Sequence, residues 1–256
     1  MMSRKVFLPG CSLSSYSPEN IEQVIRLLQD TYPDLSIVQK CCGRPTKVIG
    51  QEELFEQRFE SLVADIKACD VDEAIAACQS CLNTVNLCED YKTTSLWEIL
   101  PRLDWPEELK GKAIGSDVVF SVHDSCSVRH HHEIHNGIRE ILDMLGYKYV
   151  DPSYTHEKTR CCGYGGGVVS VNPELADRVV KRRIADFETD HIVVYCAACR
   201  QSMLKGEGRA WHILDLVFGE VVYADTVPPE DVLSNAVKAW GNRRKSRQAI
   251  KEVMEL

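Results

Sequence analysis

The chain has 256 residues, of which 44 % are hydrophobic, enough for one large domain or two small ones with real cores. Its net charge of −8 argues against nucleic acid as the main partner. No apolar run approaches the roughly 20 residues that a membrane helix needs, and the first residues lack a signal-peptide core. We therefore expect a cytoplasmic protein that is not integral to a membrane.

Twelve cysteines are the most unusual feature of the composition. In a small secreted protein they would indicate disulfides, but this chain is long and shows no secretion signal. Metal or redox chemistry is therefore the better interpretation.

The first half of the chain alternates short apolar segments with amphipathic ones. The apolar segments predict buried strands at residues 5–8, 35–38 and 73–77. Helices are expected between them, one beginning at Ser17-Pro18, where serine is an N-cap, and one from about residue 51 to 68. Cysteines follow each strand in turn: Cys11, then Cys41 and Cys42, then Cys78 and Cys81.

The same order returns in the second half of the chain. Strands are expected at residues 118–122, 147–150 and 192–195. Helices are expected from about residue 133 to 145 and, after Asn172-Pro173, to about residue 188. The cysteines that follow these strands are Cys126, then Cys161 and Cys162, then Cys196 and Cys199.

The two halves match element for element, and this duplication indicates tandem domains. We predict an α/β fold of two pseudo-symmetric repeats, each a small parallel β-sheet flanked by helices, with cysteine ligands at the strand C-terminal ends. The expected domains are residues 1–110, residues 111–228 and a C-terminal helical extension of residues 229–256. Residues 101–115 are the candidate linker, and the basic run 243–247 is interpreted as a solvated face.

A glycine-rich bend follows one pair of adjacent cysteines, in the stretch Cys161-Cys162-Gly163-Tyr164-Gly165-Gly166-Gly167. Neighbours in an extended strand point to opposite faces, so the backbone must turn for both cysteines to serve one site. Glycine permits that turn, and consecutive N–H groups in it can bind an anion. A weaker copy, Cys41-Cys42-Gly43-Arg44-Pro45, lies in the first half.

Five cysteines recur in each half with nearly one spacing, C-x29-C-C-x35-C-x2-C and C-x34-C-C-x33-C-x2-C. Structural zinc and a cubane iron–sulfur cluster each take four protein ligands. Either one cysteine in each set is not a ligand, or the site holds a larger or bridged cluster. Each C-x2-C also opens a helix, whose positive end stabilises thiolates.

These motifs, together with His123-Asp124-Ser125-Cys126, resemble the cysteine-rich CCG-domain family over about residues 5–205, and most closely the B subunit of heterodisulfide reductase. The resemblance implies a noncubane [4Fe-4S] cluster in each repeat, with zinc in one repeat as the lesser possibility. The ligands that it implies are Cys11, Cys41, Cys42, Cys78, Cys81, Cys126, Cys161, Cys162, Cys196 and Cys199.

The same resemblance implies an oxidoreductase subunit that reduces a small-molecule disulfide. Its electrons would come from a C-like partner subunit with cubane [4Fe-4S] clusters, in a complex with a flavin-containing subunit. The alternative is an iron–sulfur electron-transfer subunit of a lactate- or glycolate-type dehydrogenase without its own substrate site. A zinc-bound or thiol-sensing scaffold is a third hypothesis.

Several further residues have two interpretations each. His123 is either a hydrogen-bond or proton donor at the second site or a strand-end histidine without a role. Of the cluster His130, His131, His132 and His135, the pair His131 and His135 could bind metal, although a helix-start cluster that is solvated, or that orders the mouth of the site, is preferred. Cys69 and Cys88 are expected to be packing residues. Arg44 and Arg129 either hold an anionic substrate or offset cluster charge.

Overall fold

The structure, a computed structural model, describes residues 4–88 and 90–254. The chain forms two compact units. Unit 1 comprises the residues up to 104 together with those from 235 onward, and unit 2 comprises residues 105–234. The C-terminal segment is thus part of unit 1.

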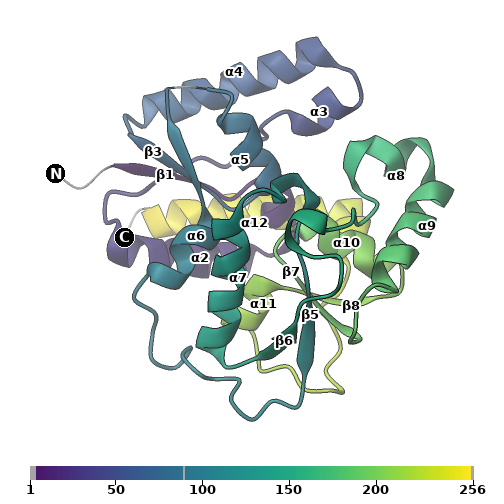
Figure 1. Ribbon diagram of the computed structural model, residues 1–256. Coiled ribbons are helices and arrows are strands. Elements are labelled where there is room, and N and C mark those ends of the chain that lie inside the picture. The colour runs from purple at the N-terminus through teal and green to yellow at the C-terminus, as the bar shows by residue number, and fades with distance from the viewer. Residues whose placement is uncertain (1–3, 89, 255–256) are drawn as a thin grey trace. The chain divides into compact units, whose positions relative to one another are not determined.

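Unit 1 contains a four-stranded, fully parallel sheet in the order β2-β1-β3-β4. Its strands are β1 (Lys5–Leu8), β2 (Ser36–Ile37), β3 (Glu73–Ala76) and β4 (Lys92–Ser95). The helices of unit 1 are α1 (Cys11–Tyr16), α2 (Pro18–Thr31), α3 (Arg44–Val48), α4 (Glu52–Ala68), α5 (Gln79–Val85), α6 (Leu96–Ile99) and α12 (Ala236–Met254), with a 3-10 turn η1 (Leu100–Arg102) (Figure 1).

Unit 2 repeats this topology in a parallel sheet of order β6-β5-β7-β8. Its strands are β5 (Val119–His123), β6 (Lys148–Val150), β7 (His191–Val194) and β8 (Arg209–His212). Its helices are α7 (His132–Leu145), α8 (Val168–Val171), α9 (Pro173–Ile184), α10 (Ala197–Lys205) and α11 (Ile213–Phe218), with 3-10 turns η2 (Cys126–Val128), η3 (His156–Lys158), η4 (Gly165–Gly167) and η5 (Val232–Ser234).

The predicted fold class, an α/β chain of two parallel-sheet repeats, is confirmed. The expected N-caps are also present: the Ser17 side chain accepts from the Asn20 N–H, and Asn172 accepts from the Leu175 N–H. The fourth strand of each sheet, β4 or β8, was not predicted. Both are short, and β4 has the polar sequence Lys-Thr-Thr-Ser, so neither has the apolar run that marks the buried strands.

The last helix, α12, begins later than the expected residue 229, at Ala236, because the Asn235 side chain accepts from the N–H groups of Val237 and Lys238. It packs beside α1 and α2 (Figure 1). The Ser246 hydroxyl donates to the Ser14 carbonyl at 2.8 Å. The helix therefore supports α1, whose first residue is Cys11.

The expected linker, residues 101–115, is packed against the rest of the chain at a few positions. Trp105 is only 2 % exposed. The N–H groups of Gly111 and Ala113 donate to the carbonyls of Met144 and Leu145, at the end of α7. The second half of this stretch therefore forms part of unit 2.

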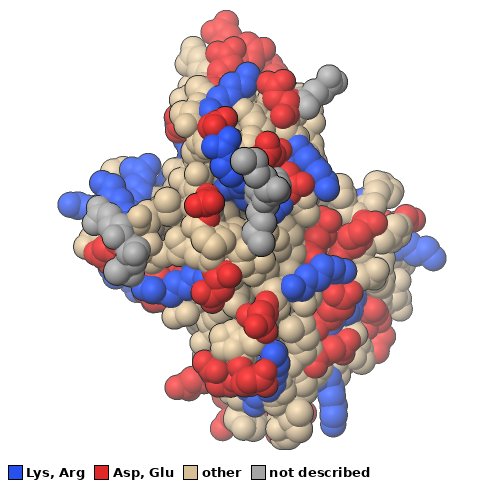
Figure 2. Space-filling model, turned by 90° about the vertical axis from the view of Figure 1, so that its left-hand side faces the viewer, with Lys and Arg blue, Asp and Glu red and all other residues tan. Residues whose placement is uncertain are grey.

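The surface mixes charges of both signs. On the face that Figure 2 displays, Lys and Arg side chains are interspersed with Asp and Glu. Among the described residues, no helix has both the length and the apolar character that crossing a membrane requires.

The core of unit 2 is built around Phe120, which is completely buried. Its ring makes edge-to-face contacts with Tyr147, His191 and Trp211, with centroids 5.2–6.0 Å apart. Phe120, the second residue of β5, thus contacts side chains from β7 and β8 and from the residue just before β6.

Replacing Phe120 by alanine is expected to lower the free energy of unfolding by about 3–5 kcal/mol, because it removes this ring and leaves a cavity. The measurement is a guanidinium titration of the reduced, metal-free protein. The control is Val227→Ala, at a position 80 % exposed, where a change within about 0.5 kcal/mol is expected. Equal effects of the two changes would contradict this account of the core.

Candidate metal centre

The cysteines of each five-residue set converge at the carboxyl edge of one sheet. In unit 1, Cys11 opens α1 just after β1, and Cys78 is the N-cap of α5 just after β3. Gly10 allows this approach: it has φ +77°, and a Cβ there would lie 2.6 Å from the Cβ of Cys78. Any larger residue at position 10 would therefore push the first and third cysteine segments apart.

Both adjacent cysteine pairs are followed by a left-handed glycine, as the bend requires. Gly43 has φ +80° and Gly163 has φ +86°. The Gly163 N–H turns back to donate to the Cys161 sulfur at 3.3 Å. A Cβ on Gly163 would lie 2.8 Å from the Ala176 carbonyl oxygen, so only glycine fits there without a shift.

Within unit 1 the five sulfurs interact as one group. The pKa of Cys41 is lowered to about 5, first by a hydrogen bond from Cys11, and the pKa of Cys42 is lowered to about 7, first by a hydrogen bond from Cys81. The donors respond in the opposite direction: the pKa values of Cys11 and Cys81 are raised, and Cys78 contributes to both rises. Some thiols in the group thus keep their protons so that their neighbours can ionise.

The cysteines of unit 2 form the same kind of chain. The hydrogen bond from Cys126 lowers the pKa of Cys161, and the pKa of Cys126 is raised in return. The sulfurs of Cys162 and Cys199 are hydrogen bonded at 3.4 Å. Hydrogen bonding from Cys199 and from the first N–H groups of α10 lowers the pKa of Cys196 to about 7, although burial acts to raise it.

The close spacing of five thiols in each unit shows whether the two sites are suited to bind a metal centre. All twelve cysteines are free thiols, and five in each unit compete for negative charge at one place. A positive group would let every member ionise at once, since only the thiolate binds a metal. The donor set therefore fits a thiolate-ligated metal or iron–sulfur centre in each unit.

Two arginines near the first set were not identified from the sequence. Arg58 and Arg243 both lower the pKa of Cys41 through their charge. Arg243 lies on α12, in the basic run that was interpreted as a solvated face, and its buried Nε has no hydrogen-bond partner among the described residues. For Arg243 that interpretation is wrong, because α12 folds back onto α1. No local sequence signal reveals such a contact across more than 200 residues.

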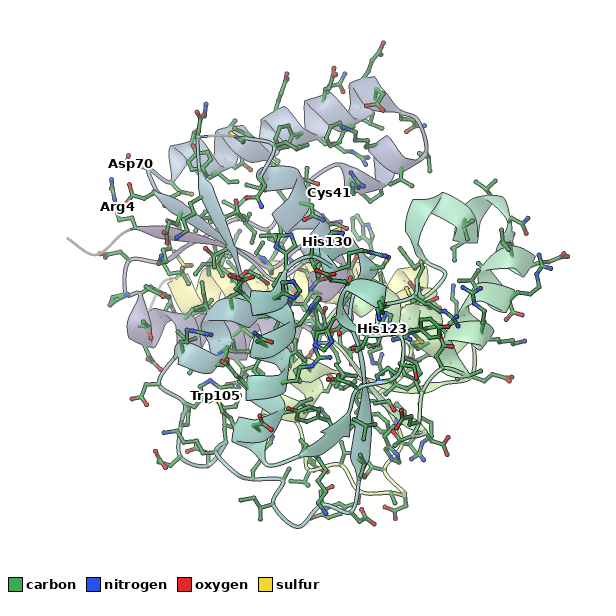
Figure 3. The ribbon with its side chains drawn as sticks, in the orientation of Figure 1. Arg4, Cys41, Asp70, Trp105, His123 and His130 are labelled. Atoms are coloured by element: carbon green, nitrogen blue, oxygen red, sulfur yellow. The ribbon has the colours of Figure 1, made fainter. Side chains whose placement is uncertain are left out.

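His123 lies at the end of β5, beside the second set (Figure 3). One of its ring nitrogens and the sulfurs of Cys162 and Cys199 all lie within 4.8 Å of one another. Its Nδ1 accepts a hydrogen bond from Nε of Arg183 at 3.1 Å, whereas its Nε2 has no partner among the described residues. Because Nδ1 is an acceptor, the proton of the neutral ring is on Nε2.

Burial, followed by the charge of Arg183, lowers the pKa of His123 to about 3. The ring is therefore neutral at pH 7 and offers a fixed N–H rather than an acidic proton. Arg183 itself is fully buried, with its guanidinium 4.4 Å from the Phe187 ring. Its position explains how one tautomer of His123 is selected.

The other singled-out residues are dispersed. Cys69 donates to the Asp65 carbonyl and Cys88 is half-buried, both outside the two sets. Arg129 donates to backbone carbonyls at Cys126, Glu157 and Thr159, and so holds loops together. Arg44 is exposed at the start of α3.

The interpretation of the histidine cluster as a solvated helix start is wrong for His135, and the structure places other residues than His131 beside the His135 ring. His135 is buried, and its ring lies 5.2 Å from that of His156 and 6.2 Å from that of His132. His132 in turn lies 3.1 Å from a Glu157 carboxylate oxygen, and His130 is exposed. His156, which helical spacing could not indicate, is the partner that sequence reasoning missed.

Comparison with known proteins finds the same two repeats. The family model described as a cysteine-rich domain, CCG, matches twice, at residues 6–86 and 120–204. An uncharacterized iron–sulfur protein of Methanocaldococcus jannaschii is 28 % identical over 207 residues, which is 77 % of this chain and 40 % of that protein.

Two components of reductases are also similar. The B subunit of fumarate reductase (CoM/CoB) from Methanothermobacter marburgensis is 26 % identical, covering 87 % of this chain and 47 % of its own length. The D subunit of dihydromethanophenazine:CoB–CoM heterodisulfide reductase from Methanosarcina acetivorans is 26 % identical, covering 65 % of this chain and 44 % of its own length. The chain thus spans less than half the length of these relatives.

The lowered pKa of Cys41 predicts a specific reactivity. In reduced, metal-free protein, Cys41 is a thiolate above about pH 5, so its alkylation by iodoacetamide should be near its plateau at pH 7 and should fall as the pH drops through 5. Cys11→Ala removes the hydrogen-bond donor and should move the midpoint upward, towards the ordinary thiol value of 9.0. Peptide mass spectrometry across a pH series measures both.

The matched control for this measurement is Cys69→Ala, which lies outside both sets and should leave the Cys41 profile unchanged. A wild-type midpoint near 9.0, or one that does not respond to Cys11→Ala, would show that the sulfurs do not interact as described.

Proposed function

Because the chain belongs to the CCG cysteine-rich domain family, we propose that it is the member of an iron–sulfur complex that resembles the B subunit of heterodisulfide reductase, and that it reduces a small-molecule disulfide. The observation that carries the proposal is the pair of complete five-thiol sets, one at each sheet edge. Each set has one thiol more than zinc or a cubane cluster needs.

The ten cysteines of the two sets would hold two noncubane [4Fe-4S] clusters, one in each unit. When bound, such clusters supply single electrons at a site lined with thiolates. The protein's part is to gather the thiols and offset their charge. Arg58 and Arg243 do this beside Cys41, and the first N–H groups of α10 do it at Cys196.

The proposed role of His123 is to donate a hydrogen bond from Nε2–H to the sulfur of the second centre. Its Nε2 lacks any other acceptor among the described residues, and Arg183 fixes the tautomer. With a pKa of about 3 the imidazolium form is scarcely populated near neutral pH, so the alternative of proton donation to a product thiolate has less support. Hydrogen bonds to cluster sulfurs are one of the means by which proteins raise reduction potentials.

The reaction would break one S–S bond and yield two thiols, consuming two electrons and two protons. We propose that the electrons come from a partner subunit with cubane [4Fe-4S] clusters, in a complex that also contains a flavin subunit. The approach to the second centre would be at Tyr164 and Gly165–Gly167, because these residues are largely exposed and Cys161 beside them is only half-buried. The glycines leave this approach without side chains.

The proposal predicts disulfide-dependent oxidation of a chemical reductant. Anaerobically prepared protein with its clusters, given reduced methyl viologen and a panel of low-molecular-weight disulfides, should oxidise about two viologens for each disulfide cleaved. Cys162→Ser should lower the rate by about tenfold or more and the iron content from about eight to about four per chain. Viologen absorbance and iron analysis give the two readouts.

The matched control is Cys69→Ser, which should keep both rate and iron content. Clusters that accept electrons but never pass them to a disulfide would overturn the proposal in favour of an electron-transfer subunit. About four irons with one zinc in the wild type would contradict the two-cluster assignment.

The role of His123 predicts a change in potential without loss of iron. His123→Leu removes the N–H and should lower the reduction potential of the second centre by about 60 mV, equivalent to a tenfold change in a one-electron equilibrium. A redox titration followed by electron paramagnetic resonance measures it. His123→Gln, which retains an N–H donor, should recover part of the difference, whereas an identical potential in all three proteins would rule out the hydrogen bond.

A further inference from the structure

A second group of potential ligands lies in unit 2, apart from the five thiols. Asp124 follows β5, His135 lies in the first turn of α7, and His156 begins η3. One ligand atom from each of the three lies within 4.8 Å of the other two. Ligands of one tetrahedral zinc ion, each about 2.0–2.1 Å from the metal, are about 3.3 Å apart, so the three side chains would move closer together on binding it.

The strongest observation is His135. Its side chain is completely buried, and neither ring nitrogen has a hydrogen-bond partner among the described residues. A buried imidazole that makes no hydrogen bond costs free energy, because in water both nitrogens would be satisfied. One of its ring nitrogens lies within 4.8 Å of a ligand atom of Asp124 and of His156, which points to something bound between the three.

His156 is held in place at a conformational cost. It has φ +50°, a left-handed backbone that histidine adopts uncommonly. Its N–H donates to Oδ2 of Asp124 at 2.9 Å, and the neighbouring Thr155 hydroxyl donates to the same oxygen at 2.7 Å. These contacts fold the loop onto Asp124 and bring the His156 ring to 5.2 Å from that of His135. Strain of this kind persists only where the surroundings enforce it.

The charged side chains around Asp124, His135 and His156 are compatible with a bound cation. Arg139 makes a paired interaction with Asp124, at 2.7 and 2.9 Å, and also contacts Asp151. Two carboxylates therefore share one guanidinium. Oδ2 of Asp124 is fully used, but Oδ1 accepts one short bond from Arg139 and only a long one, 3.4 Å, from the Tyr195 hydroxyl. Oδ1 is thus the oxygen with capacity for another ligand.

We propose that His135, His156 and Oδ1 of Asp124 form a binding site for a divalent zinc-class ion, separate from both five-cysteine sets. Two imidazoles and one carboxylate oxygen are a donor set that zinc takes, with water completing the tetrahedron. His132 is not part of the site, since it pairs with Glu157.

The ion would stabilise the loops that carry two cysteines of the second set, Cys126 and Cys161. Asp124 lies two residues before Cys126, and its carbonyl accepts from the Thr159 hydroxyl at 2.7 Å, two residues before Cys161. An ion shared by Asp124 and His156 would join the two loops that carry these cysteines. It would do so through nitrogen and oxygen ligands, which leaves the thiols free for their own centre.

The test compares zinc content between variants of the full-length protein, because free thiols also bind zinc. Wild type, His135→Leu, His156→Asn and the exposed control His130→Leu are incubated with zinc alone and desalted, and bound zinc is measured by mass spectrometry. His135→Leu and His156→Asn should each hold about one zinc fewer than wild type, and His130→Leu none fewer. Asparagine tolerates the left-handed backbone at position 156, so this variant removes the ligand without adding strain.

X-ray absorption at the zinc edge identifies the lost ion. The difference between wild type and His135→Leu should contain nitrogen and oxygen neighbours at about 2.0–2.1 Å and no sulfur at about 2.3 Å. Circular dichroism before zinc is added checks that the variants are folded. Equal zinc in all four proteins, or a lost ion with sulfur neighbours, would overturn the proposal and leave His135 bound to water.

Discussion

The constraint on which this molecule depends is that like charges cannot gather without a counter-charge. Each sheet delivers five thiols to one edge, and the thiols respond by ionising alternately: the pKa of Cys41 is lowered while that of Cys11 is raised, and the pKa of Cys161 is lowered while that of Cys126 is raised. The surroundings serve this same need. Left-handed glycines after the adjacent pairs turn two neighbouring sulfurs inward, helix starts supply N–H groups, and Arg58 and Arg243 supply charge.

Much of the fold follows from local patterns. Short apolar runs identify the first three strands of each sheet in chain order, and Ser17 and Asn172 mark helix starts because their side chains cap them. The fourth strands, β4 and β8, could not be predicted in this way, because they form by pairing along β3 and β7 rather than from apolar runs of their own. The start of α12 was also misplaced, since the cap at Asn235, rather than the prolines before it, ends the loop.

Some residues of the candidate site could likewise be predicted from the sequence, and others could not. The ten cysteines can be found by counting, because their order is repeated in the chain. What surrounds them is set by contacts distant in sequence: Arg183 reaches His123 across 60 residues, and Arg243 comes from the far end of the chain. Helical spacing suggested His131 as the neighbour of His135, but the left-handed turn at His156 brings that residue in instead. Sequence patterns thus identify candidate ligands, whereas contacts made in the fold determine their environment.

The discontinuity of unit 1 has a consequence for biogenesis. Residues 105–234 are contiguous, so unit 2 has all its elements as soon as that stretch leaves the ribosome. Unit 1 has to wait for α12, which packs on the helix that begins with Cys11 and carries Arg243 towards Cys41. Domains generally fold as units, so a unit is complete only once all its segments have been synthesised. The elements of unit 2 are therefore all synthesised before those of unit 1 are complete, although the first cysteine set is translated earliest.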